Sequence, residues 1–444
     1  MARAKKEAAL TPEERLQAAL VLDWEWPYKL PENWCWTRHN SIMDIVGGAQ
    51  PEKAFFIREP KEGYVQLYQT RDYGENPVPV YIPQKYATKT TDEGDILLAR
   101  YGGSLGKVFR AHKGAYNVAL AKVIILYPEV VDDEFLYLYY YSHFYQDFCI
   151  KAGYGRSAQA GFNKSDLNEL LFPLPPFIEQ RRIVERIESL FAKLDEAKEK
   201  AQAVVDSFET RRAAILHKAF TGELTVKWRE EHGVSIDNWK TTRFDSVAAI
   251  RSNLVDPAEY QSFPHIAPDN IEKKTGVLLE YHTIAEDGVT SGKHRFYSGQ
   301  ILYSKIRPNL SKVVVVDFDG LCSADMYPIE AYQNARCLWY YMLSDEFLLQ
   351  ASTAGSRSVL PKINQKELSA LTVHLPTNDR EQEEITRILD ELFDKEQQSK
   401  EAAEAVLDQI DLMKKSILAR AFRGELGTND PSEESAVELL KQIF

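Results

Sequence analysis

The sequence has few cysteines and no long apolar run. Its four cysteines, among 444 residues, lie far apart and form no CxxC pair, so we expect no disulfide framework and no zinc site. The stretch nearest to a membrane span, Phe135 to Tyr141, is much too short to cross a bilayer. The first residues, Met-Ala-Arg-Ala-Lys-Lys-Glu, lack the apolar core of a signal peptide. We therefore expect a cytoplasmic protein that does not engage a membrane, with about two to four domains.

The motifs of common catalytic sites are also missing. The stretch from Gly102 to Lys107 resembles a phosphate-binding loop, but Tyr101 and Val108 stand where that motif needs Gly and Ser or Thr. No GxSxG, HExxH or metal-spaced histidine pair occurs. Residues 76–79, Asn-Pro-Val-Pro, lack the second proline and the aromatic residue of the target-base clamp of adenine methyltransferases. We expect no catalytic residue, no metal and no cofactor in this chain.

A long heptad pattern is the strongest feature that the sequence does contain. Apolar residues recur at alternating steps of four and three between Phe177 and Phe220, which predicts one long helix that packs against a partner helix. About 42 residues at 1.5 Å each make a rod of roughly 60 Å. Gly222 is placed to end it. The predicted seam consists of Ile183, Ile187, Leu190, Leu194, Ala197, Ala201, Val204 and Phe208.

The same pattern returns 202 residues later, so the partner helix can come from the same chain. Both copies end alike, with Ala219 to Leu224 in the first and Ala421 to Leu426 in the second. Two polar residues in the second seam lower its stability but can fix its register. A coiled coil that joins two separate molecules is the alternative. The second predicted seam consists of Ile385, Leu389, Leu392, Glu396, Ser399, Ala403, Val406 and Ile410.

The regions before the two helices are duplicated as well. Asn33-Trp34 recurs as Asn238-Trp239, and further matches lie at offsets of 201 to 205 residues. Short β-like runs alternate with turn residues, so we expect tandem α+β domains, each followed by a long helix. The expected boundaries are 1–29 for an N-terminal arm, 30–173 for the first domain, 174–222 for the first helix, 223–237 for a linker, 238–375 for the second domain, 376–424 for the second helix and 425–444 for an acidic C-terminal tail.

Charge is spread unevenly along the chain. The net charge of −12 argues mildly against a nucleic-acid partner. However, residues 53–122 carry 11 Lys and Arg against 7 Asp and Glu, whereas residues 379–423 carry 12 acidic against 8 basic residues. The acid is therefore concentrated on the second helix and the tail, and the local field around the globular regions allows DNA as a partner.

Basic, aromatic and amide residues cluster around the predicted turns of both domains. Arg can bind guanine edges through two hydrogen bonds, Asn can bind adenine, and Lys contacts phosphate. Ordinary solvated loop charges are the alternative for any single residue. The expected DNA-binding residues are Tyr68, Arg71, Tyr73, Arg100, Tyr101, Lys107, Arg110 and Arg156 in the first domain, and Arg251, Asn253, Lys305, Arg307, Asn309, Lys312 and Arg357 in the second.

Four motifs together resemble the specificity (S) subunit of type I restriction-modification systems over nearly the whole chain. They are Leu-Pro-x-x-Trp at 30–34, Gly-Asp-Ile-Leu at 94–97, Leu-Pro-Pro-x-x-Glu-Gln-x-x-Ile at 174–183, and Ala-Phe-x-Gly-Glu-Leu at the end of each long helix. The second Leu-Pro motif departs from the pattern, because Thr377 and Asn378 follow it and one residue is added.

The resemblance implies two α+β target recognition domains, separated by two long antiparallel coiled-coil helices with pseudo-twofold symmetry. Each domain would read one half of a split target on double-stranded DNA, and the helices would set the spacer. They would also dock two methyltransferase (M) subunits that carry S-adenosylmethionine, and restriction (R) subunits would add ATP-driven cleavage. This chain would be non-catalytic. A coiled-coil scaffold whose domains bind proteins, and a nucleotide-using enzyme with an unrecognised site, remain alternatives.

Overall fold

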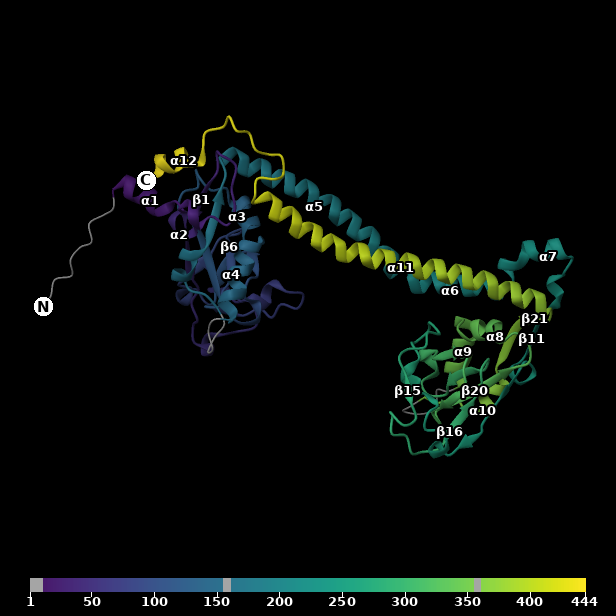
Figure 1. Cartoon of the computed structure of the whole chain (residues 1–444). Coiled ribbons are helices and arrows are strands. Elements are labelled where there is room, and N and C mark those ends of the chain that lie inside the picture. Colours follow the sequence, from purple (N-terminus) through teal and green to yellow (C-terminus); the bar gives the residue numbers. More distant parts are fainter. Residues whose placement is uncertain (1–10, 155–160, 355–360) are drawn as a thin grey trace. The chain divides into compact units, whose positions relative to one another are not determined.

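The computed structural model describes residues 11–154, 161–354 and 361–444 (Figure 1). The chain forms two compact units. Unit 1 contains the residues up to Lys200 together with Val406–Phe444, and unit 2 is Ala201–Ala405. Both units therefore contain one globular domain and parts of both long helices. Within the described ranges, no helix is long and apolar enough to cross a membrane.

A four-stranded antiparallel sheet of order β2-β9-β6-β7 forms the frame of unit 1. Side chains alternate between its faces, so Ile96 and Leu98 pack with Phe135 and Tyr139, while Leu97 belongs to a separate small core. A short ladder of β1 with β10 lies next to the helices. These elements are β1 (Cys35–Arg38), α2 (His39–Ile42), β2 (Met43–Gly47), β6 (Ile96–Ala99), β7 (Val108–Arg110), β9 (Leu120–Ile125), α3 (Asp133–Tyr139), α4 (His143–Tyr154) and β10 (Leu171–Leu174).

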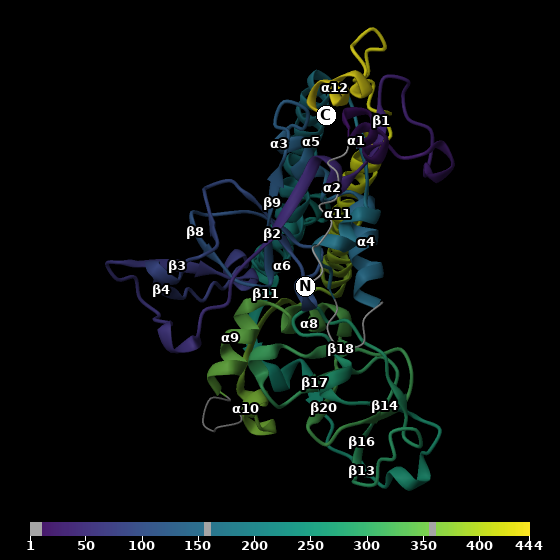
Figure 2. The same ribbon diagram turned by 90° about the vertical axis from the view of Figure 1, so that its left-hand side faces the viewer.

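A second, smaller sheet extends unit 1. Its order is β4-β3-β8-β5, and Figure 2 shows β3, β4 and β8 side by side. Leu67, Ile82 and Ala115 form its core. The strands are β3 (Tyr64–Tyr68), β4 (Tyr81–Pro83), β5 (Thr90–Thr91) and β8 (Gly114–Tyr116).

Unit 2 repeats the frame of unit 1 strand for strand. Its four-stranded sheet has the order β12-β20-β17-β18, and β11 pairs with β21 as β1 pairs with β10. The second sheet differs, with five strands in the order β13-β16-β19-β14-β15. The elements are β11 (Trp239–Arg243), β12 (Ala248–Ile250), β13 (Leu254–Val255), β14 (Pro264–Ile266), β15 (His282–Thr283), β16 (Lys293–Phe296), β17 (Ile301–Ser304), β18 (Val313–Val315), β19 (Gly320–Cys322), β20 (Met326–Ala331), α8 (Ala335–Met342), α9 (Asp345–Ala354), α10 (Gln365–Ala370) and β21 (Thr372–Pro376).

The first long helix is interrupted once, where the sequence predicts a single helix. It consists of α5 (Phe177–Asp206) and α6 (Phe208–Phe220), and the break falls at Ser207. The Ser207 hydroxyl donates to the carbonyl oxygen of Ala203 at 2.6 Å, a bond that competes with the regular helix ladder. The second long helix, α11 (Asp379–Ala421), is continuous over 43 residues.

In each unit the long helices contact each other with opposite chain directions. In unit 2, Arg211 pairs with Glu396 at 2.6 Å, and the Lys400 ammonium lies 4.8 Å from the centre of the Phe208 ring. In unit 1, the pairs are Asp195 with Lys414, and Lys198 with Asp411. Residue numbers rise along one helix as they fall along the other, so the paired stretch within each unit is antiparallel.

The predicted seam of α11 is wrong at two positions. Ser399 and Val406 are exposed, the latter by 43%, and Lys400 and Leu407 are half-buried instead. The residue that follows Glu396 in the seam is therefore Lys400, four residues on, rather than Ser399, three residues on. Residues three and four apart lie on the same face of a helix, so both steps are compatible with a seam. Lys400 suits such a position because its aliphatic stem can lie on apolar surface while its charge reaches water.

The first described residues, from Thr11 on, and the C-terminal residues both belong to unit 1. Thr11 and Glu14 form a capping box at the start of α1 (Pro12–Ala19). The last residues, expected to form an acidic tail, include α12 (Ala436–Ile443), whose Ala436 and Leu440 are fully buried in the core of unit 1. Figure 1 shows α12 beside α1. Unit 1 thus has two short helices, α1 and α12, outside its domain and its long helices. In unit 2, the connection between α6 and β11 holds one short α-helix, α7 (Val226–His232).

A buried glutamate near the start of each long helix binds the tryptophan that leads into its domain. The Trp34 indole donates to Glu179 at 2.8 Å, and the Trp239 indole donates to Glu381 at 3.0 Å. Burial raises the pKa of Glu179, and its hydrogen bonds offset this only in part. Burial also acts to raise the pKa of Glu381. The hydrogen bonds that Glu381 accepts, from Arg229 at 2.7 Å and from Asn238, Thr225 and Trp239, outweigh this effect and hold its pKa below the usual range.

The arginine that distinguishes the two glutamates predicts different mutational effects. Glu381→Gln should destabilise unit 2 by about 1–3 kcal/mol at neutral pH, because Arg229 would keep a buried charge without its carboxylate. The matched change Glu179→Gln should cost less. The raised pKa of Glu179 means that its stabilising contribution is present at acidic pH and is lost as pH rises through the folded-state pKa. The contribution of Glu381 is lost as pH falls through its lowered pKa.

Urea unfolding followed by tryptophan fluorescence, at acidic and at neutral pH, measures both effects. Equal losses for the two variants at neutral pH would contradict the role assigned to Arg229.

Candidate nucleic-acid interface

The hairpin that joins β6 to β7 holds four of the predicted DNA-binding residues. Arg100 is half-buried, and its guanidinium donates to the carbonyl oxygen of Val118 at 2.9 Å and lies 4.7 Å from the centre of the Tyr101 ring. The Tyr101 hydroxyl donates to Asn163 at 3.3 Å. Lys107 is exposed and has no ion-pair partner within the ranges that the structure describes. Lys107 is therefore the most accessible cation of this hairpin.

Arg110 is held by interactions inside its own domain. Its guanidinium pairs with Asp133, approaches Glu134 at 2.8 Å and donates to the carbonyl oxygen of Gly94 at 2.9 Å. It also lies 4.3 Å from the centre of the Tyr137 ring. Two carboxylates offset its charge, so this arrangement joins β7 to α3 and leaves Arg110 little capacity for a base or a phosphate.

Tyr68, Arg71 and Tyr73 lie together at the end of β3. Tyr73 stacks on Phe109 at 4.6 Å and on His112 at 5.9 Å. Burial raises the pKa of Tyr73 to about 12, so its hydroxyl stays protonated near neutral pH. Arg71 is exposed and has a distant ion pair, 3.9 Å from Asp72.

The smaller sheet of unit 1 carries further lysine and aromatic pairs that the sequence reading missed. Lys61 lies 5.5 Å from the centre of the Tyr64 ring, and Lys85 lies 4.9 Å from that of Tyr86. Phe55 stacks on Tyr86 at 4.2 Å. Alternating basic and aromatic residues provide charge and stacking surface, both of which nucleic acids use. The Lys85-Tyr86 dipeptide, within the basic stretch, is the signal that could have pointed to this surface.

In unit 2, the equivalent hairpin between β17 and β18 has an unusual backbone. Arg307 and Ser311 have φ values of 48° and 45°, in the left-handed region that side chains other than glycine rarely adopt. They flank a short 3-10 turn, Pro308–Leu310, and the Arg307 amide is held by the carbonyl oxygen of Pro361 at 2.8 Å. Strain of about 1–3 kcal/mol per residue persists only where the surroundings impose it, and such residues cluster at binding sites. The loop exposes Arg307 and Asn309.

The other predicted residues of unit 2 differ in accessibility. Lys305 and Lys312 are half-buried, and their ammonium groups donate to the carbonyl oxygens of Ala324 at 2.5 Å and Pro268 at 2.6 Å. Arg251 is exposed and pairs with Glu330 at 2.8 Å. Asn253 is exposed on the connection between β12 and β13, and Arg156 and Arg357 lie outside the described residues.

Arg295 is a further cation that the sequence reading missed. Three aromatic rings surround its guanidinium, those of Tyr260, Phe263 and Tyr297, with the nearest ring centre at 4.8 Å. Over the part of the chain that is described, no group of three or more His, Cys, Asp or Glu side chains is placed to hold a metal ion.

Two stretches of the chain, residues 31–205 and 236–406, match the family described as type I restriction modification DNA specificity domain. Together they cover well over half of the sequence, one match for each repeat. The chain therefore belongs to the type I restriction-modification DNA specificity family.

Curated relatives agree with this assignment. The chain is 37% identical over 381 residues to the type I restriction enzyme EcoDI specificity subunit of Escherichia coli, covering 79% of this chain and 84% of the relative. It is 24% identical over 467 residues to the EcoKI specificity subunit of Escherichia coli strain K12, covering 94% of this chain and 96% of the relative.

Solved structures show the same fold at lower identity. The HsdS subunit from Thermoanaerobacter tengcongensis aligns with a TM-score of 0.60 and 18% identity, over 90% of this chain and 99% of that one. A chain from a study of complex assembly and conformational transition of the type I R-M system aligns with a TM-score of 0.66 and 18% identity, over 90% and 100%. The tandem repeat of mixed helix and strand domains is confirmed at this level.

The contacts of Arg110 predict a structural role. Arg110→Ala should destabilise unit 1 by about 1–3 kcal/mol, because charged hydrogen bonds to Asp133, Glu134 and a carbonyl oxygen are lost. Lys107→Ala, three residues away on the same hairpin, should leave stability unchanged. Chemical denaturation of both variants provides the measurement, and an unchanged midpoint for Arg110→Ala would exclude the structural role.

Proposed function

We propose that this chain is the subunit that directs a type I restriction-modification complex to its DNA target. Each recognition domain reads one half of a bipartite sequence in the major groove. The observation that carries this proposal is the pair of equivalent hairpins with unlike loops. Gly102 and Gly103 follow Arg100 in unit 1, whereas unit 2 has the strained Arg307–Ser311 loop. Equal frames with different loops suit two related sites that read different bases.

The long helices act as the spacer in this proposal. They form one antiparallel coiled coil with pseudo-twofold symmetry and hold the two domains at half-sites about one helical turn, ~34 Å, apart on one side of the DNA. Ion pairs with opposite chain directions in each unit support this arrangement. The acidic surface of α11 then faces protein rather than phosphate.

Catalysis belongs to the partners. Two methyltransferase subunits carrying S-adenosylmethionine dock on this chain, and restriction subunits supply ATP- and Mg-dependent cleavage. This chain contributes no catalytic residue and no cofactor, and it works in the cytoplasm, where the DNA is.

Binding to DNA in the presence of the methyltransferase subunits tests the proposal. Electrophoretic shifts with a random duplex library should select a split motif, and affinity should fall steeply with salt because phosphate contacts release counterions. A protein-binding scaffold would give no salt-dependent affinity for DNA. Binding of S-adenosylmethionine or ATP by the isolated chain would favour an enzyme instead.

Arg307 is predicted to read a base. Arg307→Ala should relax preference at one position of one half-site by about 1–3 kcal/mol and leave the other half-site unchanged. Arg251→Ala, in the same domain but paired with Glu330, is the control and should alter preference less. Competition binding with single-base variants of the target gives both values. A uniform loss on all sequences would assign Arg307 to phosphate.

The spacer role predicts the effect of a shortened coiled coil. Deletion of seven residues from α5, residues 196–202, with the matching heptad 407–413 of α11, keeps the seam and shortens the pair by roughly 10 Å. The preferred spacer should shorten by about three base pairs, while both half-sites stay the same. Sequencing of selected DNA measures this, and altered half-sites would contradict the role of the helices.

A further inference from the structure

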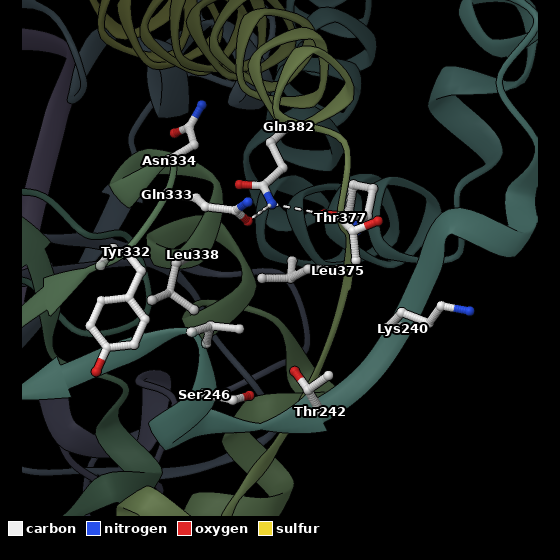
Figure 3. Close-up of a pocket in the computed structure, with 13 residues that line it drawn as sticks. Lys240, Thr242, Ser246, Tyr332, Gln333, Asn334, Leu338, Leu375, Thr377 and Gln382 are labelled. Atoms are coloured by element: carbon white, nitrogen blue, oxygen red, sulfur yellow. Dashed lines mark hydrogen bonds between the residues drawn. The ribbon is translucent and has the colours of Figure 1, made fainter.

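A cavity of about 360 Å³ opens beside β11 in unit 2 (Figure 3). It lies over one face of the β11–β21 ladder, next to the end of β20 and the starts of α8 and α11. Figure 3 shows Gln382 on one side of it, hydrogen-bonded to Gln333 at 2.9 Å. Val247, Leu338 and Leu375 contribute apolar lining, and Lys240 and Thr242 contribute polar side chains.

The equivalent face in unit 1 is covered by the chain itself. Cys35 and Thr37 occupy the positions of Lys240 and Thr242, and they are 7% and 0% exposed. Lys240 is exposed and Thr242 is half-buried. The same repeat therefore has one covered copy and one open copy of this face.

The cover in unit 1 is an extended segment that precedes β1. Leu20 stands opposite Thr37 in an antiparallel bridge, and the Val21 amide donates to the carbonyl oxygen of Trp36 at 3.0 Å. The helices α1 and α12 adjoin this segment, with Leu16, Leu20 and Leu440 in the surrounding core.

A longer connection adds to the cover in unit 1. The chain between β9 and α3 runs through Val130 and Val131, both 1% exposed. The connection between β20 and α8 in unit 2 consists only of Tyr332, Gln333 and Asn334. Both parts of the cover are therefore missing from unit 2.

The outer edge of the uncovered strand β11 is also paired with no strand among the described residues. Trp239 stands opposite Pro376, which has no amide hydrogen, so this is a non-hydrogen-bonded pair of the antiparallel ladder. The alternation makes Thr241 and Arg243 non-hydrogen-bonded as well, so their backbone groups point to the outer edge. There the Ser246 hydroxyl donates to the carbonyl oxygen of Arg243 at 2.6 Å, which leaves the Arg243 amide as the open group of that residue. The described residues place no strand there.

The geometry points to a strand-like segment of the docked methyltransferase subunit as the occupant of this edge and cavity, an inference that rests on the proposed function. Its chemistry follows from the cover in unit 1. The segment is an extended stretch whose backbone pairs with Thr241 and with the amide of Arg243. An aliphatic side chain of the segment lies opposite Thr242 and enters the cavity. Strand addition to an exposed edge is a general mode of peptide recognition.

The segment comes from another polypeptide because the candidates among the described residues 11–154, 161–354 and 361–444 are engaged elsewhere. Leu20, Val21 and α12 belong to unit 1. The linker between α6 and β11 is held by Arg229, which donates to the carbonyl oxygen of Gly222 at 2.9 Å and to Glu381. Because unit 1 covers its own copy, only one of two bound methyltransferase subunits uses this contact.

The backbone contact can be tested with a pair of variants at Arg243. Its φ of −73° suits proline, so Arg243→Pro removes the outward amide hydrogen and leaves the bonds between β11 and β21 in place. Arg243→Ala removes the same side chain and keeps the amide. Native mass spectrometry of the full chain, titrated with the purified methyltransferase subunit, gives the two stepwise dissociation constants.

We expect Arg243→Pro to weaken one of the two steps about fivefold to tenfold, the effect of one lost backbone hydrogen bond, and Arg243→Ala to change neither by more than about twofold. Equal constants for the two variants would overturn the inference while the proposed function stands. A wild-type chain that binds no methyltransferase subunit would overturn the proposed function itself.

A second pair of variants tests the cavity independently of the backbone. Ser246→Trp places a bulky side chain among the residues that line the cavity. Ser246→Ala is its control, because both variants remove the hydroxyl that donates to the carbonyl oxygen of Arg243 and only the tryptophan adds bulk. Of the two steps of methyltransferase-subunit binding, the one weakened by Arg243→Pro should also be weakened by Ser246→Trp and not by Ser246→Ala. Hydrogen exchange should also show that the amide of Arg243 becomes protected when the methyltransferase subunit binds. Unchanged exchange at Arg243 in the wild-type complex would contradict strand addition.

Discussion

A buried carboxylate at the start of each long helix ties that helix to its domain. Glu179 accepts the indole hydrogen of Trp34, which directly precedes β1, and Glu381 accepts that of Trp239, the first residue of β11. Strand and helix are therefore joined where the chain enters each domain. The rest of each unit depends on this junction, because the first and last strands of the domain pair beside it. A domain that reads DNA needs such a rigid attachment, since its loops must keep their position relative to the DNA bases.

The two copies of this junction have diverged in charge. Arg229 supplies a buried cation to Glu381, whereas Asn429 and Thr428 supply neutral donors to Glu179. The same divergence extends to the neighbouring surface, which unit 1 covers with the segment around Leu20 and Val21 and unit 2 leaves open. A duplicated chain can thus combine a repeated frame with contacts that differ between its halves.

Much of the frame could be predicted from the sequence, because repeated tryptophans, glycines and heptads survive in both halves. The burial of Lys400 in place of Ser399 could not be predicted, because a step of three and a step of four residues both return a side chain to the same face of a helix. The ion pair of Arg110 with Asp133 and the hydrogen bond from Lys312 to the carbonyl oxygen of Pro268 could not be predicted either, because the partners come from distant segments of the chain. The strain at Arg307 depends on Pro361, more than fifty residues further on. The choice of base-contacting residues therefore stays a prediction.

Sequencing of methylated positions in DNA modified by this chain together with the proposed methyltransferase subunits tests the central claim most directly. The account predicts a split motif of two unlike half-sites at one fixed spacing, with one modified base in each. A contiguous motif, or half-sites that occur at variable spacing, would contradict it.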